Sequence, residues 1–205
     1  MSSSALQPVA HHPLAVGPWA HSTYRIRRPF WSIFGRRFLV FAPDGSLVLF
    51  VKHPYFKFKP EFTLFTDETE SVPVMIVRSR TVLAINRAYD VFDAQTQAKL
   101  GTIRSRGLKS IVRDTWDLLD ANDQPVGLVQ EDGLSILRRI FPILLGRWHA
   151  ELGGSPVATI QQLFRLFIKE YTIDVSMAQG RIDPRFVIAI AMLALLAESA
   201  REAAS

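Results

Sequence analysis

The chain has 205 residues, of which 48% are hydrophobic and 21% are charged, so it is long and apolar enough to bury the core of one domain. It contains no cysteine, which excludes disulfides, thiolate metal sites and thiol nucleophiles. The formal net charge of +5 favours anionic partners such as phospholipid head groups or nucleic acid.

Residues 1–22 mix Ser, Ala, Pro and His without periodicity, which is typical of a flexible leader. They show no positively charged region ahead of an apolar segment, so no secretory signal is predicted. We therefore expect a cytoplasmic protein with a single ordered domain over residues 23–205.

From Thr23 onward the chain repeats one pattern, in which a short run of β-branched and aromatic residues precedes turn residues. Side chains alternate where this can be checked: Tyr24 and Ile26 take one face and Arg25 and Arg27 the other. A long antiparallel sheet usually curls or closes, because closure removes its exposed edges. The expected strands lie near residues 23–28, 36–42, 47–52, 61–66, 72–78, 87–93, 99–105, 110–120, 125–131, 146–152, 156–162 and 167–176.

Two of the expected hairpins resemble each other. Residues 89–94 and 100–103 parallel residues 116–121 and 126–129, since both read aromatic, Asp, two apolar residues and Asp-Ala before a returning strand with an early Gly. Either this is an internal repeat or hairpins of similar register have converged on similar residues. Both interpretations support a series of hairpins.

The last apolar run, residues 186–197, is apolar on every helical face. As a helix it rises about 18 Å at about 1.5 Å per residue, against the roughly 30 Å of hydrocarbon in a bilayer. Asp183 suits the N-cap and Pro184 the first helical position. We therefore expect a buried core helix over residues 184–200. The predicted fold is mainly β (α+β), with about twelve antiparallel strands in a closed β-barrel around this central hydrophobic C-terminal α-helix.

Four motifs resemble the phospholipid scramblase and LURP-one-related family: the strand Tyr89–Asp93, the strand Ser110–Trp116, the turn Glu131–Gly133 and the helix entry Asp183–Arg185. The resemblance extends over roughly residues 23–200. It implies the tubby C-terminal-like fold, a closed twelve-stranded barrel threaded by a hydrophobic helix. The members it suggests include phosphoinositide-binding tubby domains and scramblases, so it implies little about function.

The chain departs from scramblases ahead of the helix. Residues 174–183 contain only two acids, Asp174 and Asp183, with Arg181 between them. Calcium takes about six to eight oxygen ligands, so calcium binding is not expected here. The cysteine-rich palmitoylation segment of animal scramblases is also missing.

Enzyme motifs are absent from the sequence, which has no nucleophile elbow, phosphate-binding loop, dinucleotide fingerprint or H-E-x-x-H pair. The adjacent pair His11–His12 is poorly spaced for a shared metal. Two pairs of acidic residues, Asp90 with Asp93 and Asp117 with Asp120, are candidate carboxylate pairs for catalysis. They lie at hairpin positions, however, where Asp commonly stabilises turns. We therefore expect no enzyme, no cofactor and no metal site.

The strongest functional signal is a set of three R-x-R triplets, at Arg25/Arg27, Arg78/Arg80 and Arg104/Arg106. Both arginines of such a triplet point to one face of a strand, and a guanidinium group binds phosphate in a bidentate way. An ordinary solvated surface is the alternative. The segment Leu137–Leu145 predicts either a shallow membrane-inserting loop or an element packed on the barrel. The residues expected to bind anionic lipid are Arg25, Arg27, Arg78, Arg80, Arg104 and Arg106.

The resulting hypothesis is a non-enzymatic tubby-like domain that binds anionic phospholipid or phosphoinositide and is peripheral at a membrane surface. A scramblase-like membrane protein with an inserted terminal helix is one alternative. Another is a nucleic-acid-binding protein, which the net charge permits although no recognised motif is present. An enzyme of unknown type is the third, and the sequence does not indicate an oligomeric state.

Overall fold

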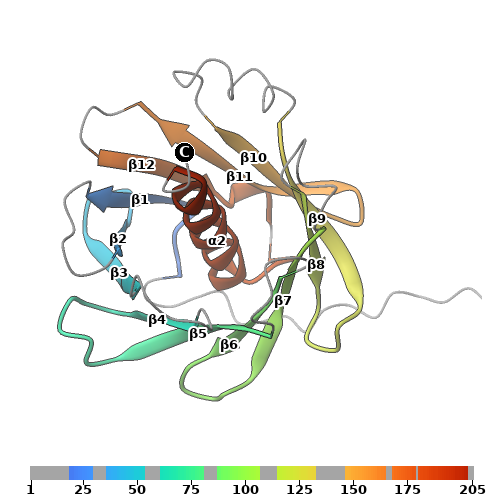
Figure 1. Ribbon diagram of the computed structural model, residues 1–205, viewed down its shortest axis with the longest axis horizontal. Helices are drawn as coiled ribbons and strands as arrows, with labels where there is room; N and C mark the ends of the chain where they lie inside the picture. The colour runs from blue at the N-terminus through green and yellow to red at the C-terminus, as the bar shows by residue number, and fades with distance from the viewer. Residues whose placement is uncertain are drawn as a thin grey trace, which may run out of the picture.

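The computed structural model describes residues 19–29, 36–53, 61–80, 87–106, 115–132, 146–164, 168–178 and 180–202. Within them, twelve strands form one closed barrel around a helix, with each strand antiparallel to its neighbours (Figure 1). The predicted fold class is confirmed. The strands are β1 (Thr23–Pro29), β2 (Arg36–Phe41), β3 (Leu47–His53), β4 (Glu61–Phe65), β5 (Pro73–Ser79), β6 (Ala88–Asp93), β7 (Lys99–Ser105), β8 (Thr115–Leu119), β9 (Pro125–Glu131), β10 (Arg147–Leu152), β11 (Ser155–Leu163) and β12 (Ile168–Asp174).

The strand bounds agree with the expected ranges to within two residues, apart from the strand expected over 110–120. There β8 begins at Thr115, and residues 110–114 lie outside the described residues. The barrel closes where β1 pairs with β12, from Thr23 opposite Asp174 to Pro29 opposite Ile168. Closure leaves no free sheet edge among the described strands.

The helix α2 (Pro184–Glu202) runs through the middle of the barrel (Figure 1). Ile188, Met192 and Leu195 are 0%, 0% and 1% exposed, as a helix that is apolar all round requires. Asp183 is its N-cap, since its carboxylate oxygen Oδ1 accepts a hydrogen bond of 2.9 Å from the Arg185 backbone N–H. Within the described residues, no helix combines the length and the apolar composition that crossing a bilayer requires.

The two ends of the barrel differ in their strand connections. One end, which we call the turn rim, carries the connections β2–β3, β4–β5, β6–β7, β8–β9 and β10–β11. The link from β12 to α2 lies there too, and it contains the 3-10 helix η2 (Ser176–Ala178). The opposite end is formed by the last residues of the odd-numbered strands and the first residues of the even-numbered ones.

Residues 19–22 pack on the turn rim, although the sequence placed them in the leader. The Ser22 carbonyl accepts a hydrogen bond of 2.8 Å from the Val175 N–H. Trp19 packs against the core, and its ring lies 5.8 Å from the guanidinium carbon of Arg185. Residues 19–22 therefore contact the barrel domain.

The two similar hairpins are β6–β7 and β8–β9, which are neighbours in the barrel. In each hairpin the early glycine, Gly101 or Gly127, lies close to the backbone of a neighbouring strand. A Cβ added at Gly101 would lie 2.7 Å from the Leu119 carbonyl oxygen, and one at Gly127 would lie 1.9 Å from the Glu151 carbonyl oxygen. Glycine occupies both positions because no larger residue fits without moving a neighbouring strand.

We expect Gly127→Ala to lower the free energy of unfolding by about 1–3 kcal/mol, because the added methyl group overlaps backbone that cannot rotate away. For a chain of this size each kcal/mol lowers the Tm by about 2–4 °C. Thermal unfolding followed by circular dichroism measures the change. Gln161→Ala, at an exposed position of β11, is the control. A Gly127→Ala protein as stable as that control would contradict the packing argument.

Candidate functional site

The structure brings together two of the three R-x-R triplets. The barrel order places β7 six strands from β1 in either direction, so the β1 triplet lies on the opposite wall from the β7 triplet. The β5 and β7 triplets are separated only by β6. Arg25 and Arg27 lie on β1, Arg78 and Arg80 on β5 and just after it, and Arg104 and Arg106 on β7 and just after it.

The second and third triplets form what we call the arginine patch: Arg78, Arg80, Arg104 and Arg106. The Arg80 N–H donates a hydrogen bond of 2.8 Å to the Ala88 carbonyl, and Ala88 is opposite Arg104 in the ladder. Neighbouring strands lie about 4.8 Å apart, which separates the Arg80 and Arg104 backbones by about 10 Å. The four side chains are between 36% and 47% exposed, so an external ligand can reach them.

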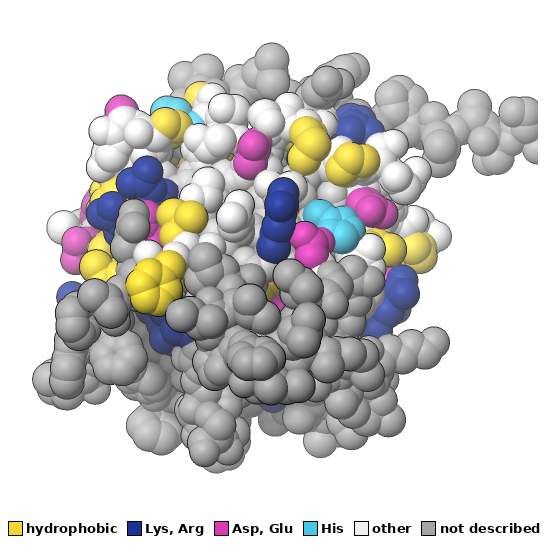
Figure 2. Space-filling view, turned by 90° about the horizontal axis from the view of Figure 1, so that it is seen from above, with side chains coloured by type: hydrophobic (Ala, Val, Ile, Leu, Met, Phe, Trp, Pro, Cys, Tyr) yellow, Lys and Arg dark blue, Asp and Glu magenta, His cyan; other side chains and the backbone are white. Residues whose placement is uncertain are grey.

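Each guanidinium of the arginine patch contacts a carboxylate. Arg78 Nε lies 2.7 Å from a Glu61 oxygen, while Arg104 and Arg106 reach the same Asp117 carboxylate at 3.3 Å and 2.7 Å. On the face seen in Figure 2, Lys and Arg side chains likewise lie beside Asp or Glu side chains. Exposed pairs of this kind stabilise a protein by about 0–1 kcal/mol. An incoming phosphate can therefore replace such a carboxylate at small cost.

The first triplet is held differently. Arg25 and Arg27 both reach Glu170, at 3.2 Å and 3.1 Å, and this glutamate is buried although its arginines are not. A buried carboxylate depends on its cations more than an exposed one does. Arg25 and Arg27 are therefore more firmly engaged than Arg78, Arg104 and Arg106.

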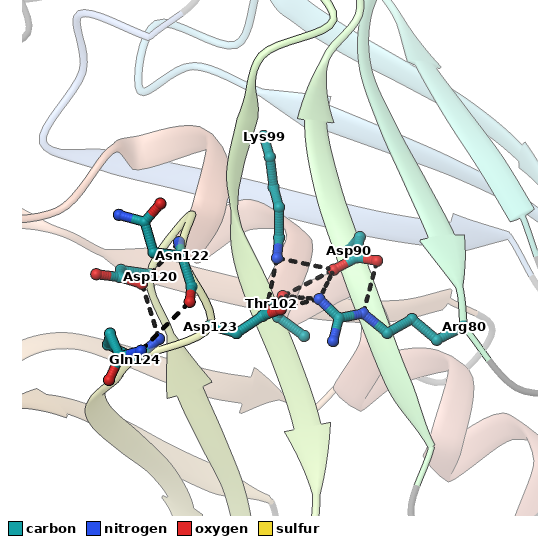
Figure 3. Close-up of polar contacts among 8 residues, drawn as sticks. All are labelled: Arg80, Asp90, Lys99, Thr102, Asp120, Asn122, Asp123 and Gln124. Atoms are coloured by element: carbon teal, nitrogen blue, oxygen red, sulfur yellow. Dashed lines mark hydrogen bonds and ion pairs between the residues drawn. The ribbon is translucent and has the colours of Figure 1, made fainter.

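Arg80 is the centre of a polar network on the outside of the barrel (Figure 3). Its Nε and Nη2 atoms bind the two oxygens of Asp90 at 2.7 Å and 2.6 Å, and Nη2 also lies 2.6 Å from Asp123. Thr102 donates a hydrogen bond of 2.7 Å to Asp90, and Lys99 Nζ lies 2.6 Å from Asp123. This Arg80 network, of two cations, two carboxylates and one hydroxyl, joins β5, β6, β7 and the β8–β9 turn.

The β8–β9 turn presents Asp123 to the Arg80 network. Asp120 Oδ1 accepts hydrogen bonds of 2.8 Å from the Asn122 and Gln124 N–H groups, which shapes the turn (Figure 3). Asp123 has a φ of 65°, a left-handed conformation that Asp tolerates better than most residues. The turn therefore holds a strained residue in place for the contact.

The Arg80 network keeps both of its carboxylates ionised. Burial by itself raises the pKa of Asp90, but hydrogen bonds from Arg80 and Thr102 and the nearby positive charges outweigh it and lower that pKa. Hydrogen bonds from Arg80 and Lys99 hold the pKa of Asp123 well below its usual value. The pKa of Arg80 is raised in return, chiefly by its hydrogen bond with Asp90.

These pKa shifts predict sensitivity to acid. A carboxyl whose folded pKa lies below its unfolded value of about 3.9 stabilises the fold above that pH, and the effect is lost as the pH falls through the folded pKa. We expect the Tm of the protein to fall as the pH is lowered from about 4 to 2.

Arg80→Met is expected to show a smaller loss on acidification, because the pKa of Asp90 and of Asp123 then moves back toward its ordinary value. Thermal unfolding at pH 7 and pH 3 compares the variants, with Arg147→Met as a control for an exposed arginine outside the network. An equal Tm difference between Arg80→Met and the parent at both pH values would contradict the argument.

Some acidic residues that the sequence assigned to turns have another role. Asp93 and Asp120 do accept turn N–H groups, as expected, whereas Asp90 and Asp117 bind arginines. The missed signal is alternation, because Asp90 lies between the inward-facing Tyr89 and Val91 and so must share the outer face with the arginines.

His149 forms a second polar cluster, on β9 and β10. Its Nδ1 lies 2.6 Å from Asp132 and its Nε2 lies 3.3 Å from Glu151, with Gln130 also within hydrogen-bond distance. Among the described residues, no group of three or more His, Cys, Asp or Glu side chains is arranged to hold a metal ion. His11, His12 and the segment 137–145 lie outside the described residues, as do Lys57, Lys59, Lys109 and Arg113.

The arginine patch belongs to a wider basic rim, the end of the barrel opposite the turn rim. We define it as residues 28–29, 36–37, 52–53, 61–62, 78–80, 87–89, 104–106, 115–116, 130–132, 146–148, 162–164 and 168–169. Among the members whose side chains are described, three are acidic, namely Glu61, Glu131 and Asp132. Nine are basic: Arg28, Arg37, Arg78, Arg80, Arg87, Arg104, Arg106, Arg147 and Lys169.

Comparison with known proteins identifies a family and similar solved structures. A family model described as LURP-one-related matches residues 22–194, from just before β1 to within α2. The X-ray structure of a protein from Arabidopsis thaliana is similar, with 15% sequence identity, coverage of 91% of this chain and 96% of that chain, and a TM-score of 0.47. A search of curated proteins found no match.

Proposed function

Because the chain belongs to the LURP-one-related family, we propose that it is a non-enzymatic barrel domain that binds anionic phospholipid at a membrane surface. The observation that carries the proposal is the arginine patch, where two R-x-R triplets from β5 and β7 share one outer face. The excess of cations over acids at the basic rim supports it, since a surface of one charge sign attracts ligands of the other sign.

Three arginines of the patch are the proposed head-group ligands. Arg78, Arg104 and Arg106 each contact a single carboxylate group, and all three are more than 40% exposed. A guanidinium can exchange such a partner for phosphate and keep a bidentate geometry. Arg80 is excluded from this role, because Asp90 and Asp123 occupy its donors in the Arg80 network.

The test is co-sedimentation with vesicles of phosphatidylcholine, either alone or mixed with phosphatidylserine or a phosphoinositide. Each arginine near an anionic leaflet contributes on the order of 1 kcal/mol, so Arg104→Ala/Arg106→Ala is expected to weaken binding by about tenfold to thirtyfold. Added salt is also expected to weaken it, since exposed charges are screened within about 8–10 Å.

The control is Arg181→Ala, which removes an exposed arginine from the turn rim and is expected to bind like the parent protein. Equal sedimentation with neutral and anionic vesicles, or none with either, would contradict lipid binding. The same samples mixed with random-sequence duplex DNA test the nucleic-acid alternative. Steep salt-dependent binding to DNA, with none to vesicles, would favour that alternative.

A further inference from the structure

Charge is separated along the barrel axis. The turn rim, taken as residues 40–48, 64–74, 92–100, 118–126, 151–156 and 173–185, carries three basic residues, namely Lys99, Arg181 and Arg185. The basic rim has the opposite balance, with nine cations against three acids among its described side chains, although Asp90 and Asp117 just beyond its bounds contact three of the nine cations. The ten acidic residues of the turn rim are Asp44, Asp67, Glu68, Glu70, Asp93, Asp120, Asp123, Glu151, Asp174 and Asp183.

Two of the three exposed large hydrophobic side chains in the described part of the chain lie at the basic rim. Among the described residues, three large hydrophobic side chains are strongly exposed: Phe164 at 58%, Ile168 at 40% and Val72 at 43%. Phe164 follows β11 and Ile168 begins β12, so both belong to the basic rim, whereas Val72 belongs to the turn rim. Apolar side chains beside cations fit the interface of an anionic bilayer, where the charges meet phosphates and the apolar groups enter the acyl boundary.

The length of the strands separates most acids of the turn rim from the basic rim, with the exception of Asp123, which lies 2.6 Å from Arg80. A seven-residue strand such as β7 spans about 23 Å at about 3.3 Å per residue. Screening limits interactions between exposed charges to about 8–10 Å at physiological salt. A barrel that stands on its basic rim therefore keeps most acids of the turn rim away from the leaflet. A barrel on its side brings acids of the turn rim against the leaflet, where they are repelled.

We infer that the protein docks end-on on an anionic bilayer, with the basic rim facing the lipid and the turn rim facing water. Phe164 and Ile168 enter the head-group region, and the cations of the basic rim other than Arg80 contact the phosphates. The inference rests on the proposed function for the existence of lipid binding, and it adds the orientation of the barrel and the apolar contact.

The apolar contact is tested with Phe164→Ala/Ile168→Ala in vesicle co-sedimentation. We expect binding to phosphatidylserine-containing vesicles to weaken by roughly tenfold, and the deficit to persist at raised salt, because burial of apolar groups is not screened. Val72→Ala is the matched control, since it removes an exposed hydrophobic side chain from the turn rim. Thermal unfolding checks that the variants are folded. A double variant that binds as well as Val72→Ala would overturn the apolar contact.

The orientation is tested with single cysteines, which the absence of native cysteine makes unambiguous. Gln161→Cys, opposite Arg147 near the basic rim, and Ala121→Cys on the turn rim each carry an environment-sensitive fluorophore. We expect phosphatidylserine-containing vesicles bearing quencher lipids to quench and blue-shift the label at position 161 and to leave that at position 121 unchanged. An equal response at both positions overturns end-on docking while lipid binding stands. Vesicles that bind neither protein overturn the proposed function and this inference with it.

Discussion

Truncation of the chain before Asp183 is expected to give an unfolded or insoluble protein, because α2 fills the barrel. The large apolar side chains of the helix contribute on the order of 12–24 kcal/mol of gross burial, at about 1.5–3 kcal/mol each. That is as large as, or larger than, the net stability of about 5–15 kcal/mol that is typical of domains. The strands around α2 would also expose their inward side chains, among them Ile26, Leu64 and Ile103, which are fully buried in the intact barrel. Far-UV circular dichroism and size-exclusion chromatography measure the outcome.

Two further variants separate loss of the core from loss of chain length. Deletion of residues 203–205, which lie beyond the described end of α2, is expected to leave folding unchanged. Met192→Asp keeps the full length but places an unpaired carboxylate at a position with no exposure, and is expected to unfold the protein as well. A truncated chain with the circular dichroism spectrum of the full-length protein would refute the role of the helix.

Arg185→Met is expected to lower the free energy of unfolding by about 3–5 kcal/mol, the usual cost of removing one partner from a largely buried ion pair. The Arg185 side chain is mostly buried and contacts both Asp183 and Asp93, while the Trp19 ring lies beside its guanidinium. Without the cation, the two carboxylates face each other in a poorly solvated site. At about 2–4 °C per kcal/mol, the Tm is expected to fall by roughly 6–20 °C.

The pH dependence of this loss identifies its origin. Burial raises the pKa of Asp93, but the Thr96 N–H and the Arg185 side chain outweigh burial and lower it. The Arg185 contribution to stability is therefore present above about pH 4, the unfolded pKa of Asp, and decreases as the pH falls. We expect the Tm deficit of Arg185→Met to be smaller at pH 3 than at pH 7. Adding Asp93→Asn should recover part of the deficit at pH 7. A deficit independent of pH would instead indicate lost packing against Trp19.

The sequence predicted where the arginines of the candidate site point, but not which residues they contact. Local alternation is enough to place Arg104 and Arg106 on one outer face, because successive side chains of a strand point to opposite sides. The partners of the arginines come from distant parts of the chain, since Arg80 meets Asp123 across 43 residues and Arg185 meets Asp93 across 92. Such pairs depend on strand register, which a single sequence does not display.

The sequence by itself determined the kind of fold. The sequence shows period-two alternation, turn residues and one helix that is apolar on every face. This combination indicates a barrel closed around the helix, because α2 must be buried on all sides. The tertiary structure alone decided which charges share a surface. Barrel closure separated Arg25 and Arg27 from the arginine patch and collected cations at one rim and acids at the other. The physical reason is that secondary structure follows from local contacts, whereas the neighbours of a surface side chain depend on the order in which the strands meet.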